Sequence, residues 1–440
     1  MMSGTVSDEA LALLMVATLF VLLMAGFPVA FTLGGVALVF GAIGLGVDFF
    51  QLLPYRIFGV IENVTLLAVP LFVYMGVMLE RSGIAEDLLA SMSLLFGRLR
   101  GGLALAVVIS GALLAASTGI VGASVVTMGL ISLPVMLSRG YPASFSSGLI
   151  CASGTLGQII PPSVVLILLG DIMGVSVGEL FLAAVVPGLL LVAAYALYSI
   201  CYCARFATDV ASETLAPTQL LQRLGKALLP PGALVLAVLG SIFFGIASPT
   251  EAAAVGAAGS MILAALYGRL SRTTLQEVMQ RTMQLTAMVF MILFGAQAFG
   301  LVFRGLNGDH AIATFVQSLQ LDAGGFLLVV MVLLFVLGCF LDFIEIVFIV
   351  IPILTPLLGA LGIPKLWFAV VVAMNLQMSF LTPPFGFSLF FLKGVAPPEV
   401  NTGHIYRGIV PFVVLQALVL TILILYPELV LWLPKQASAR

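Results

Sequence analysis

Two proline pairs are the parts of this 440-residue sequence best suited to chemistry. Pro161-Pro162 and Pro383-Pro384 each interrupt a long apolar block, over residues 102–170 and 324–394. A proline has no N–H to donate, so each pair frees backbone carbonyls in the preceding helical turn. In hydrocarbon an unsatisfied carbonyl is costly. The simplest remedy is a water-filled cavity in which these carbonyls coordinate a cation, while helix N-termini attract a carboxylate.

A polar hairpin tip accompanies each break. The first block turns at residues 117–124 and breaks at 154–163, and the second turns near 338–345 and breaks at 375–386. One proline pair would favour an ordinary kink packed against neighbouring helices. Two pairs, each beside a polar tip, instead favour a secondary transporter with its site near the membrane midplane.

The composition requires the elements that carry these breaks to be membrane helices. Hydrophobic residues make up 62% of the chain and charged residues 8%, against about 25% charged in an ordinary soluble domain. A soluble protein with this composition would expose enough apolar surface to aggregate. Spans of about 20 apolar residues are predicted near 10–26, 28–46, 62–79, 178–204, 228–247, 250–268, 284–303 and 408–432. Amphipathic segments at 84–100 and 310–322 are predicted to lie along the interface or brace the core.

Charge, cysteine content and missing motifs exclude several classes of function. The net charge is −2 and the sequence has no basic block, so nucleic acid is not an expected partner. None of the four cysteines forms a C-x-x-C pair, and we expect free buried thiols. The sequence lacks HExxH, a Walker loop and GxSxG, which argues against a metalloprotease or a P-loop ATPase. Transport would therefore draw its energy from another source.

The two apolar blocks match each other at an offset of 222 residues, which predicts an internal duplication. Besides the proline pairs, the matched positions are Pro134 with Pro356, Gly140 with Gly362, and Pro142 with Pro364. We predict a first repeat over residues 1–205, a linker over 206–227 and a second repeat over 228–440.

Each predicted repeat makes five membrane crossings, and an odd number inverts the second copy relative to the first. The hairpins are predicted at residues 102–138 and 324–360, and the broken helices at 143–170 and 365–394. The predicted fold is an all-α integral membrane protein with two inverted-topology repeats, each containing a re-entrant hairpin and a broken helix.

Four motifs resemble the large membrane subunit of tripartite ATP-independent periplasmic (TRAP) transporters. They lie at residues 119–129 (GIVGASVVTMG), 152–163 (ASGTLGQIIPPS), 249–256 (PTEAAAVG) and 382–386 (TPPFG). The resemblance covers essentially the full length. It implies an elevator-type carrier in a bacterial inner membrane, driven by a sodium gradient. It also implies two partners encoded as separate chains, which are a small four-helix membrane subunit and a periplasmic substrate-binding protein.

The resemblance also assigns site residues, as two sodium clusters and a substrate site. The first cluster joins a hairpin tip to a break and consists of Ser117, Thr118, Gly119, Gly157, Ile160 and Pro161. The second does the same with Gly338, Cys339, Asp342, Ser379, Thr382 and Pro383. Many family members have Ser-Gly-Ser where this chain has Thr118-Gly119-Ile120, so the third position offers only its backbone. The substrate is expected near Ser124, Thr127, Ser163, Asn375 and Gln377.

Two carboxylates within apolar surroundings have structural interpretations as well as functional ones. Ser248-Pro-Thr-Glu251 is a capping box with proline at the first helical position, and we expect Glu251 to cap a helix. Asp342 lies at a predicted hairpin tip, where a buried carboxylate is costly. Cation coordination and a hydrogen-bonded turn both fit Asp342, and the sequence alone does not choose between them.

The leading hypothesis is sodium-coupled uptake of a small organic acid by a protein that is not an enzyme. A channel is the first alternative, but it would need a continuous polar pore, whereas the polar groups cluster at two levels. The second alternative is a membrane-embedded enzyme acting on lipid. The sequence offers neither paired carboxylates, clustered histidines nor an activated nucleophile for that chemistry.

Overall fold

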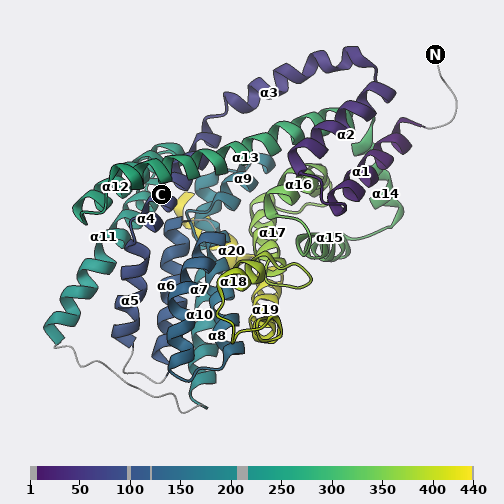
Figure 1. Cartoon of the computed structure of the whole chain (residues 1–440). Coiled ribbons are helices and arrows are strands. Elements are labelled where there is room, and N and C mark those ends of the chain that lie inside the picture. Colours follow the sequence, from purple (N-terminus) through teal and green to yellow (C-terminus); the bar gives the residue numbers. More distant parts are fainter. Residues whose placement is uncertain (1–6, 97–100, 119–120, 206–216, 439–440) are drawn as a thin grey trace.

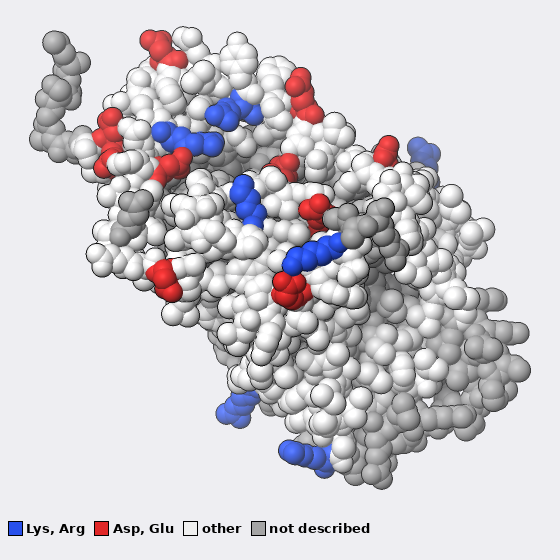
Figure 2. Space-filling model, turned by 180° about the vertical axis from the view of Figure 1, so that it is seen from behind, with Lys and Arg blue, Asp and Glu red and all other residues white. Residues whose placement is uncertain are grey.

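The computed structural model describes residues 7–96, 101–118, 121–205 and 217–438, and all regular structure in these ranges is helical (Figure 1). Seven helical stretches within the described ranges are long and apolar enough to cross a membrane. Broad areas of the surface carry neither basic nor acidic side chains (Figure 2), as expected of a surface that faces lipid. The prediction of an all-α membrane protein is confirmed.

An outer group of helices comes from the beginning of the chain and from its middle. The long helix α13 packs against both α2 and α4, and α4 also packs against α12. With 34 residues, α13 is about 50 Å long. The group contains α1 (Asp8–Met24), α2 (Val29–Gly44), η1 (Val47–Leu52), α3 (Leu53–Ile61), η2 (Val64–Leu67), α4 (Ala68–Arg81), α11 (Pro217–Phe243), α12 (Pro249–Leu266) and α13 (Arg272–Gly305).

An inner group contains the two predicted hairpins and the two predicted broken helices. The first half supplies α6 (Gly102–Thr118), α7 (Val121–Ser138), α8 (Ala143–Gly154), η3 (Thr155–Gln158), α9 (Val164–Met173) and α10 (Val177–Cys203). The second half supplies α15 (Ala323–Gly338), α16 (Phe343–Ala360), α17 (Lys365–Ser379), α18 (Phe387–Val395), α19 (Thr402–Leu425) and α20 (Glu428–Ser438). The helices end at the polar tips and proline pairs, because these positions leave backbone groups without helical partners.

Several helix boundaries differ from the prediction, and a proline or a polar helix cap explains three of the differences. Polar residues 272–281 open α13 instead of separating two spans, and Pro217 begins α11 inside the segment predicted as a linker. The last predicted span ends early, because Tyr426 leaves the helical conformation before Pro427 and the chain restarts as α20. In each case the apolar pattern was found correctly, and a proline or a polar helix cap moved the helix end.

The two halves of the inner group exchange the second parts of their broken helices. The first half's α9 packs against α16 and α17, while the second half's α18 packs against α7 and α8. Glycines permit the second contact, because a Cβ at Gly129 would lie 2.8 Å from Leu392 Cδ1. The hydroxyl of Ser388 donates to the Cys151 carbonyl across 3.2 Å. Each break is therefore packed between both halves of the chain.

Two amphipathic helices connect the outer group to the hairpins. They are α5 (Ile84–Phe96) and α14 (Gly308–Ser318), which lie where the sequence predicts amphipathic segments. Each follows a residue in the left-handed region, Gly83 at φ +66° and Asn307 at φ +55°. Glycine and asparagine tolerate this conformation best, so the chain turns sharply at the start of both helices.

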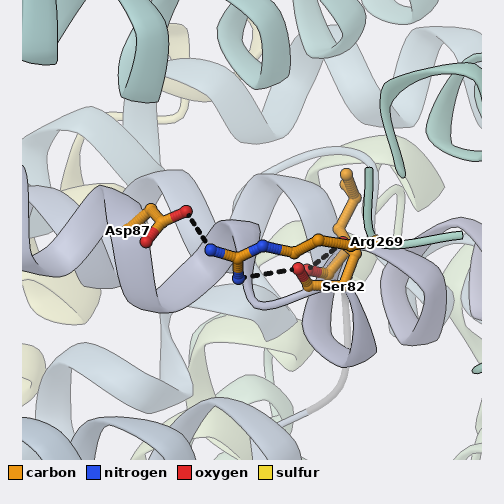
Figure 3. Close-up of polar contacts among 4 residues, drawn as sticks. Ser82, Asp87 and Arg269 are labelled. Atoms are coloured by element: carbon orange, nitrogen blue, oxygen red, sulfur yellow. Dashed lines mark hydrogen bonds and ion pairs between the residues drawn. The ribbon is translucent and has the colours of Figure 1, made fainter. Parts of the chain in front are cut away.

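Arg269, which follows α12, holds the turn between α4 and α5 (Figure 3). Its guanidinium donates to the Ser82 carbonyl at 3.0 Å and to the Asp87 carboxylate at 2.8 Å. The first bond satisfies a carbonyl at the end of α4, and the second places a cation beside the first turn of α5. The contact joins segments 182 residues apart in the sequence.

Candidate functional site

The first break lies directly against the first hairpin. A Cβ at Gly157 would be 3.5 Å from the Cα and carbonyl oxygen of Ala115, in the last turns of α6. The backbone of Ser117 and Thr118 ends α6, but Gly119 and the side chains of those two residues lie outside the described part of the structure. Of the first predicted sodium cluster, the described residues thus place the break and the end of α6 together.

The proline pair leaves carbonyls without helical donors, and one side chain satisfies part of this loss. Pro161 and Pro162 are buried, and the bond between them is cis. The Ser163 hydroxyl reaches back across both prolines and donates to the Gln158 carbonyl at 2.8 Å. Ile160 packs beside α10, because a Cβ at Gly188 would lie 3.2 Å from its Cγ1. The break is thus braced on one side by Ser163 and on another by α10.

The second break is in even closer contact with its hairpin tip. Gly338 ends α15 and faces Ser379, the last residue of α17, so closely that a Cβ on Gly338 would overlap the Ser379 hydroxyl. Cys339 follows at the C-cap and directs its thiol to the Phe335 carbonyl at 3.3 Å. The predicted members of the second cluster from α15 and α17 are therefore neighbours.

The hydroxyls of this second cluster point their protons back into the helix. Ser379 donates to the Leu376 carbonyl at 2.8 Å, and Thr382 donates to the Met378 carbonyl at 2.9 Å. A hydroxyl that donates its proton keeps oxygen lone pairs for another partner. The two side chains thus present oxygen acceptors at the break. The carbonyls that lost their helical donors there each accept another N–H, the Ser379 carbonyl from Thr382 at 3.0 Å and the Phe380 carbonyl from Ser388 at 3.3 Å.

Asp342 is a helix cap at the second tip. Its Oδ1 accepts from the Ile344 N–H at 3.2 Å, while Glu345 Oε2 accepts from the Asp342 N–H at 3.2 Å. This reciprocal capping box opens α16 and satisfies N–H groups that would otherwise be unpaired. The hydrogen-bonded turn is therefore present, and cation coordination by Asp342 stays a prediction. Sequence reasoning gave Glu345 no role, although its spacing of three from Asp342 is the capping-box signal.

Aromatic rings join the second tip to the second break. Phe380 stacks on Phe387 across the break, with ring centroids 4.9 Å apart, and meets Phe343 of α16 at 5.9 Å. Phe340 of the tip meets Phe385 of the break edge-on at 6.1 Å. These contacts hold the tip and the break as one packed unit.

The predicted substrate residues divide into paired and unpaired side chains. The Asn375 amide donates to the Met331 carbonyl of α15 at 2.8 Å, so it fixes the hairpin. Gln377 is fully buried, and neither atom of its amide has a partner. Asn375 and Ser379 share the face of α17 that meets α15, and Gln377 lies about 200° around the helix from Asn375. The structure therefore separates two residues that the sequence analysis grouped. Ser124 is buried and Thr127 half-buried on α7.

Sequence reasoning missed Gln158, which ends η3 beside the first proline pair. It is 1% exposed, and neither atom of its side-chain amide has a partner. An unsatisfied buried polar group costs about 1–3 kcal/mol. The η3 turn packs against α17, the helix that carries Gln377. A lone glutamine in the apolar run before Pro161-Pro162 was the available signal, and both amides suit a polar ligand at the breaks.

Two further predictions concern residues outside the breaks, namely the Glu251 helix cap and the four cysteines. Glu251 forms the predicted capping box, since Glu251 Oε2 accepts from the Ser248 N–H at 2.7 Å and the Glu251 N–H donates to Ser248 Oγ at 3.3 Å. All four cysteines are free, as predicted, but Cys201 is exposed rather than buried. Cys201 lies near the end of α10, on a surface that faces away from the packed interior.

Comparison with known proteins places this arrangement in a family. Residues 16–429 match the model of the tripartite ATP-independent periplasmic transporter DctM component. The C4-dicarboxylate TRAP transporter large permease protein DctM of Pseudomonas aeruginosa is 33% identical, with 88% of this chain and 90% of that protein covered. The sialic acid permease SiaM of Vibrio cholerae is 30% identical (94% and 96% covered), and the ectoine permease TeaC of Halomonas elongata is also 30% identical (96% and 98% covered).

Two solved structures share the fold. The YdaH transporter of Alcanivorax borkumensis aligns over 96% of this chain and 98% of its own, with a TM-score of 0.61 and 17% identity. MtrF of Neisseria gonorrhoeae aligns over 89% of this chain and 85% of its own, with a TM-score of 0.59 and 13% identity. At these identities the likeness concerns the fold alone.

Proposed function

The chain belongs to the DctM component family of tripartite ATP-independent periplasmic transporters, and we propose that it imports a small organic acid by sodium-coupled transport. It is a multi-pass protein of the inner membrane. Family membership implies two partners, a small membrane subunit and a periplasmic binding protein that delivers the solute. The similar permeases are named for a dicarboxylate, sialic acid and ectoine, so a carboxylate-bearing solute is the class we propose.

One observation carries the proposal: each proline break is packed against the adjoining hairpin inside the apolar interior. Ala115 meets Gly157 at the first site, and Gly338 meets Ser379 at the second. Isolated polar backbone at this depth is unfavourable, and these contacts bring the polar backbone of a hairpin end and of a break together at each site. An ion bound at both a tip and a break would hold the two together.

The donor set fits Na⁺. A hard monovalent cation prefers oxygen ligands. The second site offers the Ser379 and Phe380 carbonyls, which each accept one N–H and keep a second lone pair. It also offers the Ser379 and Thr382 hydroxyl oxygens, whose protons are directed elsewhere. Asp342 adds a carboxylate at the tip. We assign the first site to Ser117, Thr118, Gly119, Gly157, Ile160 and Pro161, because these residues likewise belong to a predicted hairpin tip and to a break.

The solute would lie between the two ion sites. Gln158 and Gln377 provide unpartnered buried amides, whose NH₂ groups suit a carboxylate. Coupling follows if sodium orders the tips around the solute, because each ligand then tightens the other.

Alternating access would use the separation between inner and outer groups. We propose that the hairpins and broken helices move as one body against the outer helices, as in an elevator, with α5 and α14 as connecting arms. The exchange of α9 and α18 between halves supports a single moving body, because neither half can shift without the other.

The test is uptake into proteoliposomes that contain all three components, with the sodium gradient imposed or collapsed. We expect uptake only with the gradient. Thr382→Val removes one proposed ligand and should raise the half-saturating sodium concentration about 10-fold. Thr355→Val is the matched control, because Thr355 also donates to a carbonyl four residues back, at 2.7 Å, but lies on α16 away from the break. Gradient-independent uptake would refute the proposal.

A further inference from the structure

A second polar site lies away from the breaks, in an open cavity of about 260 Å³. Its walls come from α3, the η2 turn, the end of α9 and the middle of α13. Arg56 and Gln297 line it from the outer group, and Asp171 lines it from the first broken helix, beside Asn63. The cavity thus joins the outer helices to a helix that continues from the first break. We call these four residues the Arg56 pocket.

The Arg56 pocket contains a hydrogen bond between its two sides. Asn63 donates from Nδ2 to Asp171 Oδ1 at 2.6 Å, across 108 residues of sequence. The same Asn63 side chain accepts from the Thr65 N–H at 3.0 Å, so this second hydrogen bond fixes the orientation of its amide. Asp171 belongs to the last turn of α9, where the helix dipole disfavours a negative charge. The Asn63 amide compensates for that unfavourable position.

Arg56 is the only basic residue among those that line this cavity. It is exposed on α3, so its guanidinium is accessible to a ligand that enters the cavity. A guanidinium recognises a carboxylate through two parallel N–H donors, and Gln297 of α13 adds an amide donor to the lining of the same cavity. These groups match one end of an organic acid.

The size of the cavity also favours a small solute. Pockets for small molecules begin near 300 Å³, so a cavity of about 260 Å³ is close to the size that a small organic acid needs. A second cavity of about 80 Å³ shares Leu293 and Gln297 in its lining, and continues between α13 and α16 to Arg304. The Arg56 pocket is therefore the larger of two adjoining cavities along α13, and the smaller one is lined mostly by apolar residues.

We infer that the Arg56 pocket is a second binding site for the transported organic acid, in which the solute carboxylate pairs with Arg56 and Gln297. This inference rests on the proposed function, since it assigns the pocket the same solute. The solute contacts the outer group through Arg56 and reaches Asp171 of the first broken helix. Asp171 repels an anion, and its presence keeps binding weak enough for the solute to leave.

The experiment is thermal unfolding of the purified full-length protein with its membrane partner, titrated with succinate, N-acetylneuraminate or ectoine, which all carry a carboxylate. At least one of them should raise the unfolding temperature of the wild type. Arg56→Gln should raise the half-saturating concentration of that solute about 10-fold, the loss of one charge-assisted hydrogen bond, and Arg56→Lys should have a smaller effect. Arg272→Gln, at an exposed position at the start of α13, should leave it unchanged.

Asp171→Asn provides an opposite test at the same site. The amide oxygen still accepts from Asn63, but the negative charge is gone, so succinate and N-acetylneuraminate should bind more tightly. The inference is overturned if no solute stabilises the wild type, if Arg56→Gln binds like the wild type, or if Asp171→Asn weakens binding of both anions. If solute binding follows these expectations but uptake does not depend on sodium, the proposed function is refuted while the Arg56 pocket is still supported as a binding site.

Discussion

Gly338→Ala is the sharpest test of the contact between the second hairpin tip and the second break. The added methyl would overlap the Ser379 hydroxyl and lie 2.7 Å from Ser379 Cβ. Ser379 is fully buried, and its hydroxyl is bonded to the Leu376 carbonyl at 2.8 Å. The added methyl therefore requires Ser379 to give up this hydrogen bond or the tip to move away from the break.

The size of the effect follows from the cost of overpacking a filled interior, which is about 1–3 kcal/mol. If sodium binds to the tip and the break together, the ion must supply this energy when it binds. A coupling of that size corresponds to about a 5- to 150-fold increase in the half-saturating sodium concentration. The maximal rate at saturating sodium should change less, because the ion restores the contact.

The assay is solute uptake into proteoliposomes over a range of external sodium concentrations. Gly359→Ala is the matched control on the same hairpin, because a Cβ there meets nothing within 4 Å. It should leave the sodium dependence unchanged. An unchanged half-saturating concentration in Gly338→Ala, with normal amounts of folded protein, would refute the shared ion site. Equal effects of both variants would show a general loss of helix packing instead.

Three further predictions concern parts of the chain that support the site. Glu251→Ala removes the reciprocal bond of the capping box of α12 and should lower the unfolding temperature slightly, with uptake per folded molecule unchanged; lost uptake at normal stability would contradict the capping role. Gly148→Ala places a methyl against the Gly408 backbone and should lower the yield of folded protein in size-exclusion chromatography, whereas Gly240→Ala, with nothing within 4 Å, should not. Arg269→Gln breaks an ion pair whose side chains are 41% and 44% exposed, so it should cost only about 0–1 kcal/mol; a much larger fall in the unfolding temperature would contradict a surface role.

The hairpin ends and helix breaks could be read from the sequence because they depend on local chemistry. Proline cannot continue a helix whatever surrounds it, so Pro161-Pro162 and Pro383-Pro384 interrupt the helices in the structure. The capping box of Glu251 is equally local, since all its groups lie within four residues. The membrane class followed from composition, because too few charged residues are present to cover a soluble surface.

Which polar side chains of α17 have hydrogen-bond partners could not be predicted from the sequence in this way. Asn375 and Gln377 are both polar residues on α17, and only the position of α15 decides that the first is bonded to Met331 while the second has no partner. The sequence gives the spacing of two residues, but the face that meets a neighbour depends on how the helices pack. Gln158 was missed for the same reason, because burial and the lack of a partner are properties of the folded interior.

The sequence by itself determined that this is a helical membrane protein whose helices are interrupted at two proline pairs, because composition and proline act without regard to distant residues. Only the tertiary structure decided that α9 packs on the second half and α18 on the first, and that Asn63 meets Asp171 beside Arg56. These contacts join residues more than 100 positions apart, and no local pattern encodes them. They arise from the way that apolar helix faces and close glycine contacts fit together across the whole chain.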